Sequence, residues 1–163
     1  MARRNALHMI FQEMGFSVQR AWLGGAVAYS VARTYSLLVR ELSRLYGRFG
    51  LSPSSFNLLM LLKHGADPDG LTQRTIGKRL VVSASDMTGL IDRLEKKALV
   101  RRTPGRDRRE KLLRITPRGS KLLDEVWPHH VETISRLCGA IGHEEGARLV
   151  EALGRLRARC ETC

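Results

Sequence analysis

Residues 71–119 read LTQRTIGKRLVVSASDMTGLIDRLEKKALVRRTPGRDRREKLLRITPRG, and this stretch decides the fold. Thr72 is suited to cap a short helix that continues through QRTIGKRL. Ser83 begins a second helix, ASDMTGLIDRLEKKA, with Asp86 three residues later in an arrangement close to a capping box. Two short helices joined by about three residues, the second ending in cations, are typical of a helix-turn-helix.

A β-hairpin is expected directly after the second helix. Residues 99–102 (LVRR) and 111–116 (KLLRIT) predict two strands, and the loop 103–110 between them contains a Pro-Gly turn. A hairpin in this position makes the unit a winged helix. The fold class that we predict is therefore mainly α with a small β-hairpin wing: a winged helix-turn-helix plus a helical dimerisation region.

Amphipathic helices flank the winged helix on both sides. Apolar residues recur every three or four positions from Leu23 to Phe49, with Thr34 filling one gap, and predict a long helix that stops at Gly50. One apolar stripe on so long a helix needs a covering surface, which in a small chain is often a partner subunit. We expect three parts, namely a dimerisation segment over 1–50, a DNA-binding winged helix over 51–116 and C-terminal dimerisation helices over 117–163.

Proline marks the remaining helices. Ser52 before Pro53, and Thr116 before Pro117, each combine a cap with proline at the first helical position. Pro128 then predicts a kink or break in the second of these helices near Val126. The last helix has an apolar stripe of Leu149, Val150, Leu153 and Leu156.

The charge of the chain is strongly positive and concentrated in one segment. The whole chain has 28 Lys and Arg against 16 Asp and Glu, a net charge of +12. Between Arg93 and Lys121 there are twelve basic residues and three acidic ones, so most of the excess lies there. Such a segment favours an anionic partner: nucleic acid, an acidic protein or a membrane surface.

Residues 71–119 resemble the MarR family of bacterial transcriptional regulators. The most specific matching parts are the D-x-R of the wing followed by L-R-I-T-P-R-G, and the S-x-S-x-x-T that opens the second helix of the helix-turn-helix. The resemblance covers nearly the whole chain from about Ala26. It implies a homodimer with interlocked terminal helices that binds a pseudo-palindromic double-stranded DNA operator, usually as a repressor. It also implies a small ligand that releases the DNA.

The resemblance places DNA-binding residues on two elements. The start of the second helix would face the major groove, with Arg93 near the backbone or groove edge. Asp107 and Arg109 match the wing motif, and Asp107 can orient the Arg109 guanidinium for insertion into the minor groove. The candidate DNA-binding residues are Gln73, Arg74, Ser83, Ser85, Asp86, Thr88, Arg93, Arg106, Asp107, Arg108 and Arg109.

Three residues depart from the family pattern. Gly89 stands where many relatives carry an arginine, so one DNA contact is expected to be missing. Asp86 would place a carboxylate near the groove, where it can cap its helix or accept a hydrogen bond from a cytosine amine. Ala98 replaces the usual glycine at the helix end, which weakens the C-cap there.

A ligand pocket is less well indicated than the DNA-binding surface. Trp22, Tyr29, Arg33 and Tyr35 lie on or next to the long first helix, and Arg33 could pair with a small aromatic or acidic ligand. Ordinary packing in the core or in an interface is the favoured reading of these side chains.

The sequence argues against catalysis, metal binding and membrane insertion. It has no nucleophile motif, no Gly-rich phosphate loop and no paired carboxylates with a matching base, so we expect neither enzyme activity nor a cofactor. The Cys160-x-x-Cys163 pair lacks a second ligand pair, and exposed helix positions are the favoured reading of His129, His130 and Glu132. No apolar run approaches the roughly 18 residues of a membrane helix. With three cysteines and no secretion signal, we expect a cytoplasmic protein.

Two other functions fit the same residues. One is a constitutive DNA-binding accessory protein of the same fold that takes no ligand. The other is a winged-helix module that binds an acidic protein partner instead of DNA.

Overall fold

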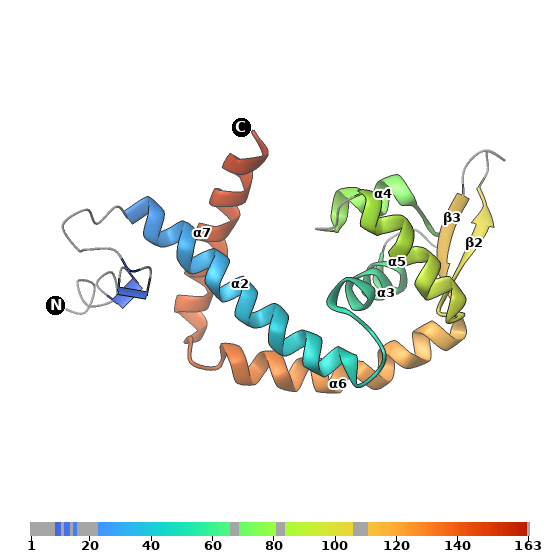
Figure 1. Ribbon diagram of the computed structural model, residues 1–163, viewed down its shortest axis with the longest axis horizontal. Helices are drawn as coiled ribbons and strands as arrows, with labels where there is room; N and C mark the ends of the chain where they lie inside the picture. Colours follow the sequence, from blue (N-terminus) through green and yellow to red (C-terminus); the bar gives the residue numbers. More distant parts are fainter. Residues whose placement is uncertain are drawn as a thin grey trace.

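Six helices and three short strands have their bounds within the described parts of the chain. The computed structural model describes residues 9–10, 12–13, 15, 23–65, 69–80, 84–105 and 111–162. The order is α2 (Leu23–Gly47), α3 (Pro53–His64), β1 (Leu71–Thr72), α4 (Gln73–Arg79), α5 (Ala84–Lys96), β2 (Val100–Pro104), β3 (Lys111–Ile115), α6 (Pro117–Cys138) and α7 (His143–Glu161). The helix-turn-helix is α4 and α5, and β2 with β3 forms the wing (Figure 1).

The capping residues predicted from the sequence begin their helices. The side-chain oxygen of Ser52 accepts a hydrogen bond from the Ser55 backbone N–H at 3.2 Å, and Pro53 takes the first helical position. Thr72 caps α4 in the same way, as does Thr116 for α6. Ser83, the expected cap of α5, lies outside the described residues.

The wing belongs to a three-stranded antiparallel sheet with the order β1-β3-β2. β2 pairs with β3 from Val100 opposite Ile115 to Pro104 opposite Lys111, so the strand extends two residues beyond the predicted 99–102. The sequence does not predict β1, which pairs Leu71 with Leu113. Two residues are too few for an alternating pattern, and this strand is fixed by its partner.

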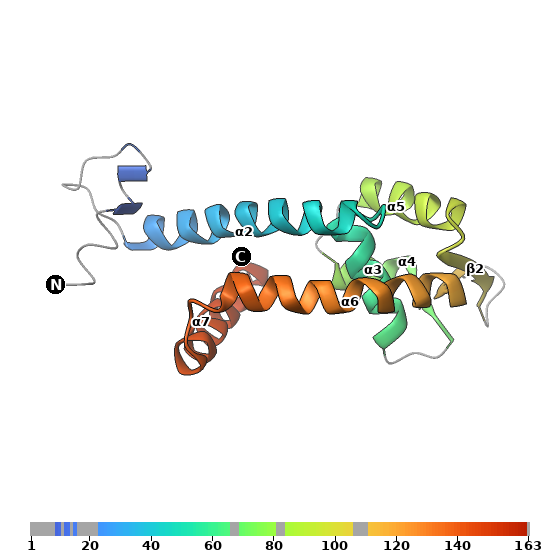
Figure 2. The same ribbon diagram turned by 90° about the horizontal axis from the view of Figure 1, so that it is seen from below.

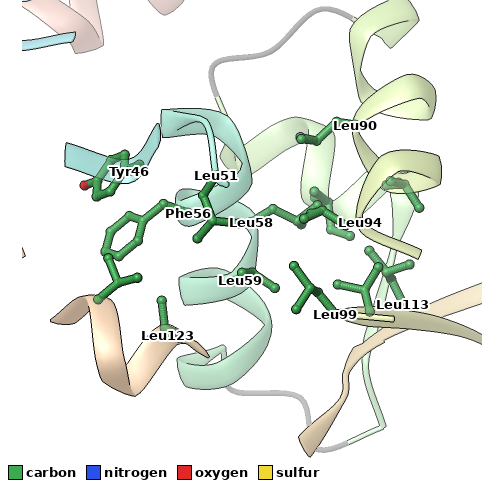
Figure 3. Packing of buried hydrophobic residues seen from close by; sticks show 14 of the residues in the cluster. Tyr46, Leu51, Phe56, Leu58, Leu59, Leu90, Leu94, Leu99, Leu113 and Leu123 are labelled. Atoms are coloured by element: carbon green, nitrogen blue, oxygen red, sulfur yellow. The ribbon is translucent and has the colours of Figure 1, made fainter. Parts of the chain in front are cut away.

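One hydrophobic core joins the winged helix to both long helices. Met87, Leu90, Ile91 and Leu94 form the buried face of α5, as predicted, and each is at most 2% exposed. The same cluster contains Tyr46 of α2 together with Leu123 and Val126 of α6. Figure 3 shows Tyr46 and Phe56 facing each other beside Leu123, and the two rings stack at 4.4 Å between centroids. The reading head, which we define as α3 to β3, is therefore held firmly against the ends of α2 and α6.

Pro128 does not break α6. Of the kink or break predicted near Val126, the break is wrong, because one helix continues from Pro117 to Cys138. Pro128 removes a hydrogen bond to the carbonyl of residue 124. Both Asp124 and Pro128 are exposed, so water can reach this side of the helix and bond to the freed carbonyl.

The far end of the molecule is poorly covered. Figures 1 and 2 show the reading head at one end and α7 with the start of α2 at the other. No residue of α7 is buried. Large apolar side chains are exposed here, including Leu23 at 65% and Val150 at 66%.

Candidate nucleic-acid interface

α5 has one apolar face in the core and one polar face in solvent. Asp86, Thr88 and Arg93 are exposed on the polar face, opposite the buried leucines. Ser85 lies in the first turn of the helix, and its side chain is not described. The exposed face thus carries the described residues that the resemblance assigns to the major groove.

A hydrogen bond from the neighbouring helix α4 holds the side chain of Thr88 in place. The Gln73 amide donates to the Thr88 hydroxyl oxygen at 3.0 Å, which links the start of α4 to the exposed face of α5. Because one lone pair of Thr88 is taken, its hydroxyl proton is free to point away from Gln73. Gln73 and the adjacent Arg74 are themselves exposed.

Arg102 of β2 joins the wing to the back of α5. Its guanidinium donates to Asp92 at 2.6 Å and also contacts Glu95, while its backbone N–H donates to Glu95 at 3.1 Å. The hydrogen bond to Asp92 is the main reason that the pKa of Arg102 is raised above its ordinary value. Sequence reasoning counted Arg102 only as part of the positive surplus. The signal that it missed is the pair of acids one turn apart on α5, facing the strand that follows.

Other cations of the segment also have internal partners. Arg114 donates to the backbone carbonyl of Asp69 at 2.7 Å and pairs with its carboxylate at 3.1 Å. Lys97 donates to the carbonyl of Gly50 at 2.6 Å. By contrast, Arg93 and Arg101 are exposed and have no acidic partner among the residues that the structure describes. The positive charge therefore divides into a part that holds the head together and a part that faces solvent.

The tip of the wing, residues 106–110, lies outside the described residues. The predicted contact of this loop with DNA, through Arg106, Asp107, Arg108 and Arg109, therefore stays a prediction. The strands that carry them run out to Pro104 and Lys111, away from the base of the wing where α6 begins (Figure 1).

A groove of about 520 Å³ lies where α2 meets the helix-turn-helix. Its lining is largely apolar and includes Tyr35 and Tyr46 of α2, Asn57 of α3 and Arg79 at the end of α4. The size suits a small organic ligand. Of the predicted ligand residues, Tyr35 lines this groove, whereas Tyr29 and Arg33 do not.

Trp22, the remaining predicted ligand residue, is outside the described part of the chain. The predicted ligand set therefore stays a prediction.

The described residues contain no group of three or more His, Cys, Asp or Glu that could hold a metal ion. His129 and Glu132 are exposed as expected, but His130 is half-buried and bonds to the Tyr46 hydroxyl at 2.8 Å. Cys138 and Cys160 are exposed thiols, and Cys163 is not described. Within the same residues, no helix is both long enough and apolar enough to cross a membrane.

Known proteins resemble both the sequence and the fold. A model of the MarR family matches residues 49–110. The chain is 30% identical over 123 residues to the uncharacterized HTH-type transcriptional regulator YkoM of Bacillus subtilis (strain 168). The matched region covers 75% of this chain and 78% of YkoM.

Two solved structures share the fold at lower identity. The S. aureus MepR–DNA complex has a TM-score of 0.72 and 22% identity over 82% of this chain and 95% of MepR. CouR from Rhodococcus jostii RHA1 bound to p-coumaroyl-CoA has a TM-score of 0.72 and 24% identity over 83% of this chain and 94% of CouR.

Proposed function

Because this chain belongs to the MarR family, whose members are transcriptional regulators and not enzymes, we propose that it represses transcription as a ligand-released homodimer on a pseudo-palindromic DNA operator. The observation that carries this proposal is the exposed polar face of α5, which presents Thr88 and Arg93 beside a basic wing. Such a protein acts in the compartment that holds the chromosome, in agreement with the cytoplasmic location expected from the sequence.

Each reading head would dock with α5 in the major groove. A helix fits that groove, where base edges can be told apart by their hydrogen-bond donors and acceptors. Ser83, Ser85, Asp86 and Thr88 would face the bases, while Arg93, Gln73 and Arg74 would contact the backbone or the groove edge. MepR, a neighbour in fold, has been solved in complex with DNA, which supports this use of the fold.

The wing would lie in the adjacent minor groove. The enhanced negative potential of a narrow minor groove attracts inserted arginine. Arg106, Arg108 and Arg109 would supply the charge, with Asp107 orienting Arg109. Phosphate contacts from such residues make the affinity strongly dependent on salt.

Two chains would pair through the end of the molecule that is poorly covered. The apolar residues of α7 and of the N-terminal half of α2 are exposed in the single chain, as expected of a dimer interface. We propose that segments 1–50 and 117–163 form this dimerisation region and that 51–116 reads the DNA. A two-fold dimer would then explain a pseudo-palindromic operator.

A small aromatic or acidic ligand would release the DNA. The groove beside Tyr46 and Arg79 touches both the long helix α2 and the end of α4, so a ligand there could shift the head against the dimer arm. CouR was solved with p-coumaroyl-CoA, an aromatic acyl thioester that carries anionic phosphates, which supports a ligand of this kind. Trp22, Tyr29 and Arg33 could join the site where a second chain completes it.

Selection of bound DNA from a random pool tests the main proposal. We expect the native protein to enrich a pseudo-palindrome whose half-sites are about one helical turn apart. Arg109→Ala should bind the selected site at least about tenfold more weakly, as expected for an inserted wing arginine. No enrichment over random sequence would favour the module that binds an acidic protein.

A titration separates a ligand-responsive repressor from a constitutive DNA-binding protein. Aromatic carboxylates added to the protein–operator complex should release the DNA, and Arg79→Ala should respond less. Complexes that persist at all ligand concentrations would support the constitutive alternative.

A further inference from the structure

Gly89 sits in the middle of α5 without a backbone reason to be glycine. Glycine destabilises a helix interior relative to alanine, so a helical glycine needs another explanation. The glycines with a left-handed φ among the described residues are Gly15, Gly50 and Gly70, and Gly89 is not one of them. No turn or helix end lies at this position, since α5 continues to Lys96.

The space beside Gly89 is filled by the guanidinium of Arg93. A Cβ atom added at residue 89 would lie 3.3 Å from Arg93 Nη1, which is tighter than most contacts of real Cβ atoms. Arg93 follows Gly89 by four residues, so both lie on one face of the helix, and long helical side chains point back toward the N-terminus. The absence of a side chain at residue 89 thus leaves room for Arg93 Nη1 close to this turn of the helix.

This guanidinium has no other described partner. Arg102 and Arg114 are each paired with carboxylates, whereas Arg93 is exposed and has no acidic partner among the described residues. It lies on the exposed face of α5, about 140° around the helix axis from Thr88, which Gln73 holds in place. Packing over Gly89 therefore keeps Arg93 on the surface that would meet DNA.

We propose that Gly89 is a positioning residue of the recognition helix, because its lack of a side chain leaves room for the Arg93 guanidinium to lie against α5 in a conformation ready to contact the duplex. The inference rests on the proposed placement of α5 in the major groove. An arginine that is already ordered loses less side-chain entropy when it forms its hydrogen bonds. Gly89 acts through Arg93 and is a positioning residue.

The substitution Gly89→Ala should move stability and DNA binding in opposite directions. Alanine favours the helix, so we expect the Tm to rise by a few degrees. The new methyl group displaces the guanidinium, so we expect operator affinity to fall about five- to tenfold. A role in folding alone would not lower affinity while raising the Tm.

Gly77 in α4 provides a matched control. It is an exposed helical glycine with nothing within 4 Å of its added Cβ. Gly77→Ala should raise the Tm by a similar amount and leave operator affinity within about twofold of the native value.

A double-mutant cycle with Arg93→Ala tests the route through Arg93. If Gly89 acts by positioning Arg93, then Gly89→Ala should cause no further loss of affinity in the Arg93→Ala background. Native-like affinity of the Gly89→Ala protein would overturn the inference, as would an equal loss in both backgrounds. A native protein that does not prefer its selected operator over random DNA would instead overturn the proposed function, and this inference with it.

Discussion

Ala98 occupies a backbone conformation that normally belongs to glycine. Its φ is +55°, in the left-handed region. The Ala98 N–H bonds to the Glu95 carbonyl at 2.8 Å and the Leu99 N–H to the Leu94 carbonyl at 2.9 Å, the two bonds of a Schellman motif. The sequence predicts a weakened C-cap here. In the structure both capping hydrogen bonds form, and Ala98 adopts the strained left-handed conformation that they require.

Ala98→Gly should therefore stabilise the protein. Relief of the left-handed strain is worth about 1 kcal/mol, which urea unfolding can measure. Ala147→Gly in the exposed middle of α7 is the matched control, and it should destabilise by a similar amount. Equal losses for both variants would show that Ala98 is not strained.

His130 makes stability depend on pH. It lies between Tyr46, Phe56 and Trp127, and its Nδ1 is 2.8 Å from the Tyr46 hydroxyl. Burial lowers the pKa of His130, and burial raises the pKa of Tyr46 to about 12, so Tyr46 stays protonated throughout the physiological range.

The direction of the pH effect follows from the lowered pKa. As pH falls through about 6.5, the unfolded chain protonates His130 before the folded protein does, so stability is present above this pH and is lost below it. We expect the native protein to lose more unfolding free energy between pH 7.5 and 5.5 than His130→Gln does. His143→Gln, at the start of α7, should retain the native pH dependence. Parallel curves for native and His130→Gln proteins would exclude this role.

At the scale of elements, Arg102 makes the wing and α5 move as one unit. Two carboxylates on α5 hold a guanidinium on β2, and the backbone N–H of the same residue adds a third bond. The guanidinium of Arg102 is thereby occupied by carboxylates of its own chain. Its expected contribution to DNA binding is to set the angle between the wing and the helix.

Arg102→Ala should weaken operator binding about tenfold without changing how steeply the affinity depends on salt. Since Asp92 and Glu95 are partly exposed, we expect a loss of only about 1–2 kcal/mol in unfolding free energy. Arg93→Ala is the contrasting variant, because the loss of a phosphate contact should reduce the salt slope by about one. A reduced slope for Arg102→Ala would mean that Arg102 leaves its acids and contacts DNA.

Elements could be predicted wherever the signal is local. Caps such as Ser52 and Thr72, and the apolar face of α5, depend on residues within one or two turns, so the sequence indicates them directly. β1 and the partners of Arg102 depend on chain segments that meet only after folding. The continuous α6 shows the same limit: whether Pro128 breaks a helix depends on what covers the carbonyl of residue 124.

The candidate site divides along the same line. The exposed positions of Thr88 and Arg93 follow from the helical period of α5. The packing of Arg93 over Gly89 does not, because a missing side chain carries no periodic signal. From the sequence, Gly89 indicates only that the DNA contact of an arginine common in relatives is missing. In the structure, the guanidinium of Arg93 lies close to the position that a side chain at residue 89 would occupy.

At the scale of the whole molecule, the reading head of the single chain has a buried core, whereas the arm, which we define as α7 and the N-terminal half of α2, leaves apolar side chains exposed. The core cluster contains residues of α2 and α6 but none of α7. Exposed apolar residues remain along α7, including Leu149 at 44% and Val150 at 66%. A second chain that covers this surface would contribute about 1.5–3 kcal/mol for each large side chain buried.

The substitution Val150→Glu should prevent the proposed dimer from forming. A carboxylate placed in an apolar interface must lose its hydration, which opposes association. We expect light scattering to report the mass of two chains for the native protein and of one chain for this variant. Because α7 contributes nothing to the core of the head, the monomer should stay folded by circular dichroism.

Glu151→Lys, which lies away from the apolar stripe of α7, is the matched control and should remain dimeric. The monomer should bind a single half-site but lose most of its affinity for the full operator, since two linked heads gain about 100-fold or more from high effective concentration. Full operator affinity in a protein that light scattering shows to be monomeric would contradict the dimeric reading of DNA. A Val150→Glu protein that stays dimeric would place the interface elsewhere on the exposed arm.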